Sequence, residues 1–279
     1  MPRLPPTERA HPRSRGLEAL PLRRLLSVLH ESDREATRAV GHAVPALARL
    51  CRLAGRSLAA GGRVAYIGAG TSGRLGALDA AEWRPTFGLA SHRVLALVAG
   101  GDPALSHAVE GAEDDASAGR AAVRRARLGS ADLAIGISAS GMTPFVLAAL
   151  AEARRRGATT SLITSNPSPK AEGVLRVVLA TGPELVAGST RMKAGSATKM
   201  ALSLFSTAVM VRAGHVRQGG MIDLVASSDK LRRRAIRLVS ELGRVSPSQA
   251  EAALLNCGWR VRAAIEEVEK LARQRGKHS

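Results

Sequence analysis

The chain has 279 residues, 45% of them hydrophobic, so it can bury the core of one sizeable domain and of smaller helical pieces. Aromatic residues make up only 2%, which leaves little to stack on nucleic-acid bases. The formal net charge of +18 raises the alternative of a polyanion-binding protein. Because the arginine clusters are scattered and no nucleic-acid motif accompanies them, we expect an anionic small substrate and no nucleic-acid partner.

The sequence features that report on compartment favour a cytoplasmic protein that does not enter a membrane. The longest apolar run, 200–211, is interrupted by polar residues and is shorter than the roughly 18 residues that span a bilayer. The first 16 residues are rich in proline and arginine, without the apolar stretch of a secretory signal, and are predicted to form a disordered or loosely docked arm. Cys51 and Cys257 lie far apart and show no metal-ligand spacing.

Periodicity in the first half of the chain predicts two helices followed by an alternating α/β region. Residues 21–59 show a helical pattern, with Ser32 and Asp33 at an N-cap position between the two helices. Helical segments then alternate with continuous apolar runs, which predicts a five-stranded parallel sheet buried on both faces. The five predicted strands are 64–68, 94–98, 133–137, 161–164 and 177–180.

The remainder of the chain is predicted to be helical. A long apolar helix is expected over 190–211, and three shorter helices follow from about residue 227. We therefore divide the chain into three parts: 1–53, an N-terminal arm with helices; 54–217, the α/β domain; and 225–279, a small three-helix module.

Two loops that follow predicted strands carry glycine together with small hydroxyl residues. Residues 68–74 read GAGTSGR and residues 138–143 read SASGMT, and each loop opens a helix. Backbone N–H groups, hydroxyls and a helix N-terminus together favour an anion. Glycines 68, 70 and 73 also fit a dinucleotide pattern, but no acidic residue ends the second strand to hold a ribose. The loops predict one phosphate held from two sides; purely structural turns are the alternative.

Charged residues near these loops are candidates for chemistry or for ordinary salt bridges. Glu82 ends the helix after the first loop, and an acidic cluster occupies residues 110–115. In the turn before the long helix, Arg191 and Lys193 could reach a carboxylate or phosphate. A salt bridge to Glu184 is the alternative for these two cations.

Several segments, in order along nearly the whole chain, resemble the N-acetylmuramic acid 6-phosphate etherases, which are proteins of the sugar-isomerase (SIS) fold. The resemblance runs from about residue 7 to about residue 270. It is carried by TER at 7–9, ESD at 31–33, IGAGTSGRLGALDAAEW at 67–83, PTFG at 85–88, VEGAEDDA at 109–116, ISASGMTPF at 137–145, GPELVAGSTRMKAGSATKM at 182–200 and MID at 221–223.

The resemblance implies one SIS domain with a five-stranded parallel sheet, a helical C-terminal module and a homodimer that needs no cofactor or metal. It implies cleavage of the D-lactyl ether of N-acetylmuramic acid 6-phosphate to N-acetylglucosamine 6-phosphate and D-lactate, by elimination and then water addition. Glu82 and Glu113 fall on the two catalytic glutamates, and we assign Glu82 as the acid and Glu113 as the base. The substrate-binding residues expected from the loops and the turn are Gly70, Thr71, Ser72, Arg74, Ser138, Ser140, Thr143, Ser189 and Lys193.

Some positions depart from the family pattern. Trp83 and Arg84 stand beside Glu82, Met142 lies in the second loop, Gly219-Gly220 precedes Met221, and Ser228 replaces an Asn. These departures could change the substrate pocket. A non-catalytic regulatory protein that binds phosphosugars is the alternative function, although such a protein would not need both glutamates.

Overall fold

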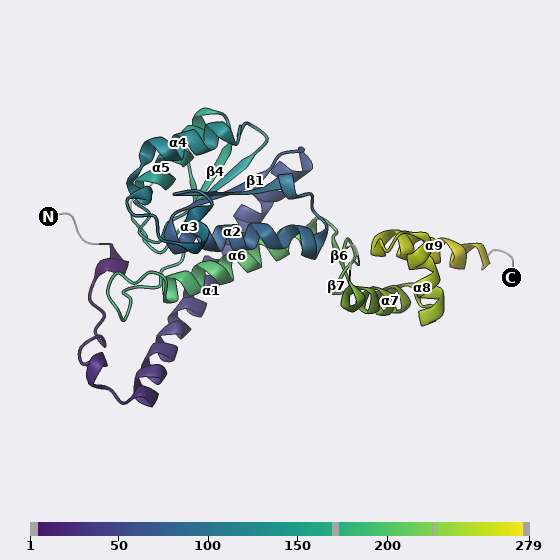
Figure 1. The fold of residues 1–279 in the computed structure, drawn as a ribbon, viewed down its shortest axis with the longest axis horizontal. Coiled ribbons are helices and arrows are strands. Elements are labelled where there is room, and N and C mark those ends of the chain that lie inside the picture. The colour runs from purple at the N-terminus through teal and green to yellow at the C-terminus, as the bar shows by residue number, and fades with distance from the viewer. Residues whose placement is uncertain (1–4, 169–172, 225, 227, 276–279) are drawn as a thin grey trace. The chain divides into compact units, whose positions relative to one another are not determined.

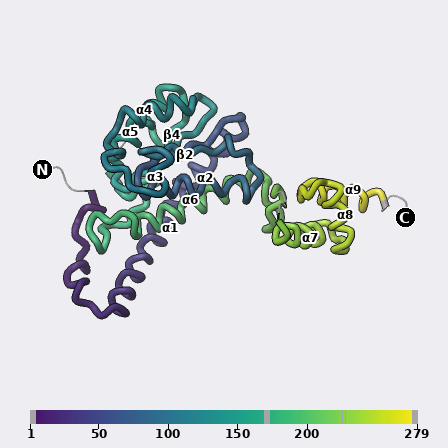
Figure 2. The backbone as a smooth tube through the Cα atoms, viewed as in Figure 1, coloured from purple at the N-terminus to yellow at the C-terminus, as the bar shows by residue number. Residues whose placement is uncertain are grey.

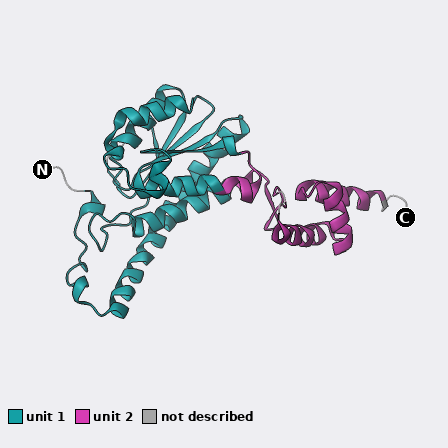
Figure 3. Cartoon of the chain, viewed as in Figure 1, with its two compact units in different colours: residues 1–81, 91–209 teal, residues 82–90, 210–279 magenta. Residues whose placement is uncertain are grey.

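The computed structural model describes residues 5–168, 173–224, 226 and 228–275. The chain divides into two compact units, one of residues 1–81 and 91–209 and the other of residues 82–90 and 210–279 (Figure 3). The first unit holds the sheet and the second holds the C-terminal helices (Figure 1). The domain boundaries expected between residues 53 and 54 and between residues 217 and 225 stay a prediction.

The first unit is built on a parallel sheet of five strands in the order β2-β1-β3-β4-β5, as predicted. The strands are β1 Val64–Gly68, β2 Val94–Val98, β3 Leu133–Ile137, β4 Thr159–Thr164 and β5 Leu175–Val178. The first three match the predicted ranges. β4 begins two residues early because Thr159 and Thr160 extend it with β-branched but polar residues. β5 begins and ends two residues before the predicted 177–180. It is an edge strand and only partly buried, so the apolar run in the sequence does not mark its limits.

Helices cover both faces of this sheet (Figure 1). Ala65 and Ile67 of β1 pack into the cluster formed with α4 (Ala116–Arg125) and α5 (Pro144–Arg155). Tyr66 points to the other face, where it contacts Phe205 edge to face at 6.3 Å between ring centroids. That face is covered by α1 (Leu22–Ala59), α2 (Gly70–Phe87) and α6 (Lys193–Arg212). The alternation along one strand thus gives a three-layer α/β/α domain.

The N-terminal helical region differs from the prediction of two helices. α1 is one helix of 38 residues from Leu22 to Ala59. Ser32 does not cap a second helix, because it lies on the buried stripe that continues through Val28 and Ala36. The stripe keeps helical spacing across Ser32 and Asp33, and burial outweighs the weak local preference of these residues for a helix end.

The arm before α1 is docked rather than loose over the residues described. Two 3₁₀ turns, Pro6–Glu8 and Leu17–Ala19, shape it. Thr7 and His11 are buried, and the Thr7 carbonyl accepts a hydrogen bond of 3.2 Å from Gly188 N–H. Figure 2 shows this purple trace beside the green trace that leads into α6. The polar composition of the arm did not predict that Thr7 and His11 would be buried. Residues 1–4 lie outside the described residues.

α6 begins at Lys193, three residues after the predicted start of 190–211. Among the described residues it is the one helix that is long and apolar enough to cross a membrane. More than half of its apolar window is buried inside the protein. This burial matches the sequence interpretation of a core helix.

The second unit contains α7 (Asp229–Gly243), α8 (Pro247–Asn256) and α9 (Val261–Arg275), which form the predicted three-helix module around their own core. A short hairpin precedes them, with β6 Val216–Arg217 paired to β7 Gly220–Met221. Gln218 and Gly219 both have positive φ, as a two-residue type I′ turn requires. Asp223 accepts hydrogen bonds from Arg262, and these hold the pKa of its carboxyl below the ordinary value even though burial opposes that shift.

Candidate functional site

The carboxyl ends of β1 and β3 lie side by side at the point where the strand order of the sheet reverses. Ligands of open α/β sheets bind in the crevice at such a switch point. The loop after β1 and the loop after β3 are the two hydroxyl-rich loops of the sequence analysis. The topology therefore brings together the two segments that were predicted to hold one phosphate.

The first loop turns from β1 directly into α2, which begins at Gly70. A Cβ on Gly68 would lie 2.6 Å from Gly73 N, and a Cβ on Gly73 would lie 2.8 Å from Gly68 O. The two glycines therefore let the strand and helix meet closely. Thr71 and Ser72 follow in the first turn of α2; they are half-buried and their hydroxyls make no side-chain hydrogen bond within the described chain.

The second loop is organised by the buried Ser138. Its hydroxyl lies 2.7 Å from the Thr143 hydroxyl and accepts a hydrogen bond of 3.0 Å from Gly141 N–H. The Ser140 hydroxyl accepts one of 3.1 Å from Met142 N–H. Ser140 and Thr143 remain half-exposed, and Thr143 is the N-cap residue of α5 without a side-chain capping bond. Two hydroxyls thus stand at the positive end of a helix.

The Arg74 side chain donates hydrogen bonds to two backbone carbonyls. Its Nε donates to the Ala104 carbonyl and its Nη2 to the His107 carbonyl, each at 2.8 Å. These bonds join α2 to the short helix α3 (Pro103–Ser106), a few residues before Glu113. Arg74 therefore positions the segment that leads to one of the proposed glutamates.

The two glutamates lie in different compact units. Glu113 lies in the 3₁₀ turn Ala112–Asp114 of the first unit, and Glu82 in the last turns of α2, in the second. Both side chains are exposed. The pairing of these carboxylates is therefore carried by the family resemblance.

The turn before α6 is held by buried charges. Glu184 is 1% exposed and accepts hydrogen bonds from the first N–H groups of α6, 3.3 Å from Lys193 N and 2.9 Å from Ala194 N. Burial raises the pKa of the Glu184 carboxyl, although these donors oppose the shift. The Lys193 ammonium, also 1% exposed, pairs with Glu35 of α1 and not with Glu184. Ser189 lies half-buried in the same turn, where its carbonyl accepts from Met192 N–H.

His11 of the N-terminal arm closes this cluster. Burial lowers the pKa of its imidazole, and the nearby Lys193 ammonium lowers it further. Its Nδ1 accepts a hydrogen bond of 3.0 Å from Arg13 N–H. The buried Lys193 thus joins the turn before α6 to α1, and His11 of the arm lies within electrostatic reach of that ion pair.

A groove of about 690 Å³ opens beside the first loop. Thr71 and Leu75 of α2 line one wall, while Arg191 and Lys199 line it from the turn and first half of α6. Its size falls within the range of small-molecule sites, about 300 to 1,000 Å³. Sequence reasoning missed Lys199 and Leu75, and also Glu35, because no local pattern shows which distant residue faces a given helix.

The departures from the family pattern have local structural explanations in part. Trp83 is fully buried, so it belongs to a protein core and not to an open pocket. Gly219 completes the hairpin turn, and Ser228 caps α7 by accepting from Leu231 N–H at 3.4 Å. Met142 is more than half exposed in the second loop. Of the four, Met142 is the one on a loop of the candidate site.

The described residues contain no group of three or more histidine, cysteine, aspartate or glutamate side chains suited to a metal ion.

Residues 47–154 match the family model described as glucokinase regulatory protein N-terminal SIS domain. Two solved structures share the fold. A protein of E. coli CFT073 in complex with A5P aligns with a TM-score of 0.51 at 18% identity, covering 72% of this chain and 97% of that one. A phosphoheptose isomerase from Francisella tularensis gives 0.51 at 16% identity, covering 68% and 98%.

The fold and the two loops define a protein of the SIS class. Closer relatives narrow the family. An N-acetylmuramic acid 6-phosphate etherase of Serratia proteamaculans is 43% identical over 261 residues, 93% of this chain and 88% of the relative. One of Thermobifida fusca is 45% identical over 262 residues, 93% and 86%. The chain belongs to the N-acetylmuramic acid 6-phosphate etherase family.

Proposed function

We propose that this protein cleaves the D-lactyl ether of N-acetylmuramic acid 6-phosphate and releases N-acetylglucosamine 6-phosphate and D-lactate. The observation that carries the proposal is identity of 43–45% to etherases over 93% of the chain. The switch-point loops supply a physical reason for the phosphate on the substrate. A purely regulatory role is not favoured, because both glutamates are present.

The phosphate is assigned to the two hydroxyl-rich loops. The hydroxyls of Thr71, Ser72, Ser140 and Thr143 and the N-termini of α2 and α5 point to an anion there. Gly70 gives the backbone room to turn toward it, and Ser138 orients Thr143. The phosphate takes no part in the chemistry. Its binding energy positions the reacting carbons of the sugar.

We assign cleavage of the ether to an elimination because direct displacement of lactate by water is difficult. In the open-chain sugar the aldehyde acidifies the C2 proton. Glu113 removes that proton, the C2–C3 double bond forms, the C3–O bond breaks, and the Glu82 carboxylic acid protonates the departing lactate oxygen. Water then adds, with its hydroxyl going to C3 and a proton to C2. Each acid–base contribution is worth about 10² to 10⁴ in rate.

Assembly and location complete the proposal. The family resemblance implies a homodimer, and a second copy would cover the exposed Leu78 of α2 and Leu204 of α6. We place the protein in the cytoplasm with a soluble phosphosugar as its small-molecule partner. No organic cofactor or metal enters the proposed reaction.

The test is a D-lactate assay on the purified protein with N-acetylmuramic acid 6-phosphate. Release of D-lactate with N-acetylglucosamine 6-phosphate supports the proposal. Tight binding of both phosphosugars without lactate release would favour the regulatory alternative. Neither binding nor release would remove both functions.

A further inference from the structure

The groove beside the first loop carries two cations that the proposed reaction has not used. Arg191 and Lys199 line it, and both side chains are exposed. Within the described residues neither forms an ion pair. Lys193, two residues after Arg191, is instead buried against Glu35. Of the two cations predicted from this turn, Arg191 is therefore the one open to a ligand, and Lys193 holds the turn that presents it.

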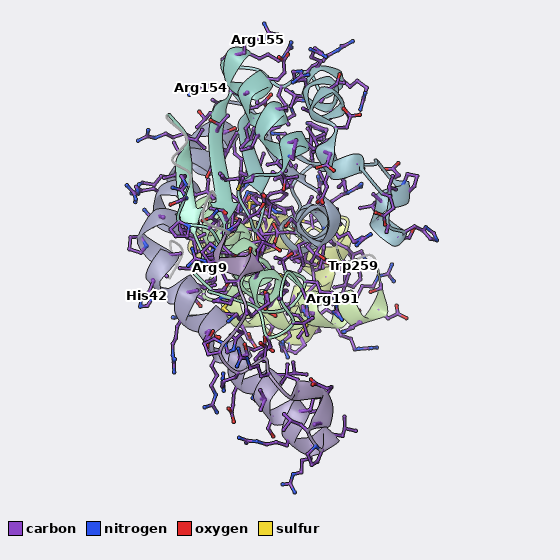
Figure 4. The ribbon with its side chains drawn as sticks, turned by 90° about the vertical axis from the view of Figure 1, so that its left-hand side faces the viewer. Arg9, His42, Arg154, Arg155, Arg191 and Trp259 are labelled. Atoms are coloured by element: carbon purple, nitrogen blue, oxygen red, sulfur yellow. The ribbon has the colours of Figure 1, made fainter. Side chains whose placement is uncertain are left out.

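The start of α6 lies against the first loop, at a distance where a side-chain carbon on Gly195 would make ordinary van der Waals contact with Thr71. A Cβ on Gly195 would lie 3.5 Å from Thr71 Cγ2 and 3.4 Å from Thr190 O. Thr71 lines the groove together with Arg191. The groove thus starts at the first loop and continues along α6. Figure 4 places Arg191 at the opposite end of the strands from Arg154 and Arg155, so it is separate from the arginine cluster at the end of α5.

The proposed substrate has two anionic groups, and the two loops account for one. Hydroxyls and helix N-termini suit the phosphate. A carboxylate is matched by the planar fork of a guanidinium, which binds it through two parallel hydrogen bonds. Leu75 and Met200 add apolar wall to the same groove, which suits the methyl group next to that carboxylate.

We propose that Arg191 binds the carboxylate of the lactyl group, with Lys199 as the second cation of the same subsite. Arg191 is then the specificity residue that distinguishes the lactyl ether from sugar phosphates without a carboxylate. This inference rests on the proposed function, since it assumes that the substrate carries a lactyl group. It assigns no proton transfer to Arg191.

The experiment compares two ligands that differ by the lactyl group. Binding of N-acetylmuramic acid 6-phosphate and of N-acetylglucosamine 6-phosphate is measured by calorimetry in a Glu113→Gln background, in which turnover is expected to be slow. Adding Arg191→Leu should weaken the first by about 10- to 100-fold, the equivalent of one charge-assisted contact, and leave the second within about twofold. Arg125→Leu, which changes an exposed arginine of α4, is the matched control and should change neither.

A modified ligand sharpens this test. In the Glu113→Gln background, conversion of the lactyl carboxylate to its amide should weaken binding about as much as Arg191→Leu does. In the protein with both substitutions the amide should cause little further loss, because the two changes remove the same contact. Arg191→Lys should bind the acid with intermediate affinity.

Three outcomes would overturn the inference. Equal loss for both phosphosugars would place Arg191 on the phosphate. No loss for either would show that Arg191 does not contact the ligand, and additive losses in the amide experiment would show that it contacts another group. The proposed function fails separately, through absence of D-lactate release by the wild-type protein. A thermal unfolding curve for Arg191→Leu checks that the exposed substitution leaves the fold intact.

Discussion

The two ends of the parallel sheet both gather polar residues, but they differ in how those residues are used. At the amino end, the carboxylate of Asp132 is 5% exposed and accepts from the Arg63 guanidinium, Arg63 N–H and Gly129 N–H. Arg63 Nη1 donates to the Ala126 carbonyl, and Nη2 donates to the Arg127 carbonyl as well as to Asp132. Both charges of this ion pair therefore end on protein partners.

At the carboxyl end, the hydroxyls of Thr71, Ser72, Ser140 and Thr143 are half-exposed and aligned with helix starts. Of the hydroxyl residues of the two loops, Ser138 alone is buried. A polar cluster whose donors and acceptors pair within the protein holds the fold, whereas a cluster with unused donors can bind a ligand. Substitutions at one end of the sheet should therefore leave the properties of the other end unchanged.

The largest effect is expected from the glutamates of the ligand end. Glu113→Gln and Glu82→Gln should each lower kcat by about 10² to 10⁴ while N-acetylglucosamine 6-phosphate still binds, since each removes one proton transfer. Steady-state lactate release and calorimetry measure the two quantities. Glu110→Gln, in the same acidic cluster, is the control and should keep most activity. Normal turnover in either glutamine variant would exclude that residue from the chemistry.

The structural end should respond in stability and not in affinity. Asp132→Ala leaves Arg63 without its carboxylate and should lower the free energy of unfolding by about 3 to 5 kcal/mol, as loss of one partner of a buried pair does. Glu31→Ala breaks the exposed pair with Arg13 and should cost less than about 1 kcal/mol. Denaturant unfolding compares them. Equal costs would mean that burial does not distinguish the two pairs.

Loss of a single loop hydroxyl should have a moderate effect on substrate binding. Ser140→Ala and Thr143→Ala should each raise KM by about 3- to 10-fold with little change in kcat, because one hydrogen bond to the phosphate is lost. Ser130→Ala, an exposed residue before β3, is the control. A fall in kcat with unchanged KM would move these hydroxyls from phosphate binding to the reacting centre.

The smallest effect is a pH dependence at the structural end. Burial opposes ionisation of Asp132, but hydrogen bonds from Arg63 and Gly129 outweigh it, and the pKa of the carboxyl lies below its ordinary 3.8. The stability that this ion pair contributes is therefore complete above pH 3.8 and lost as pH falls through the lower pKa of the folded state. The gap in stability between wild type and Asp132→Asn should shrink over that range. A gap that stays constant with pH would contradict the shift.

The sequence predicted those parts of the fold that have a strong local signal. β1, β2 and β3 are continuous apolar runs, and their limits were found. The break in α1 was wrong because Ser32 looks like a cap locally but lies on a buried stripe set by distant packing. The short β6–β7 hairpin has too few residues for a periodic pattern.

The candidate site was predicted in the same uneven way. Both loops were found because glycine and hydroxyl residues follow strands. The partner of Lys193 was not, since Glu35 lies 158 residues earlier and only the folded chain brings the two together. The open position of Arg191 relative to Lys193 likewise depends on which way each side chain faces after packing.

The most direct test of the proposed elimination follows the oxygen of water through the reaction. The protein converts N-acetylmuramic acid 6-phosphate in ¹⁸O-labelled water, and the masses of both products are measured by mass spectrometry. If the elimination operates, the oxygen at C3 of N-acetylglucosamine 6-phosphate carries ¹⁸O and D-lactate carries none, because the C3–O bond breaks and water adds at C3. Label in D-lactate, or no D-lactate at all, would contradict it.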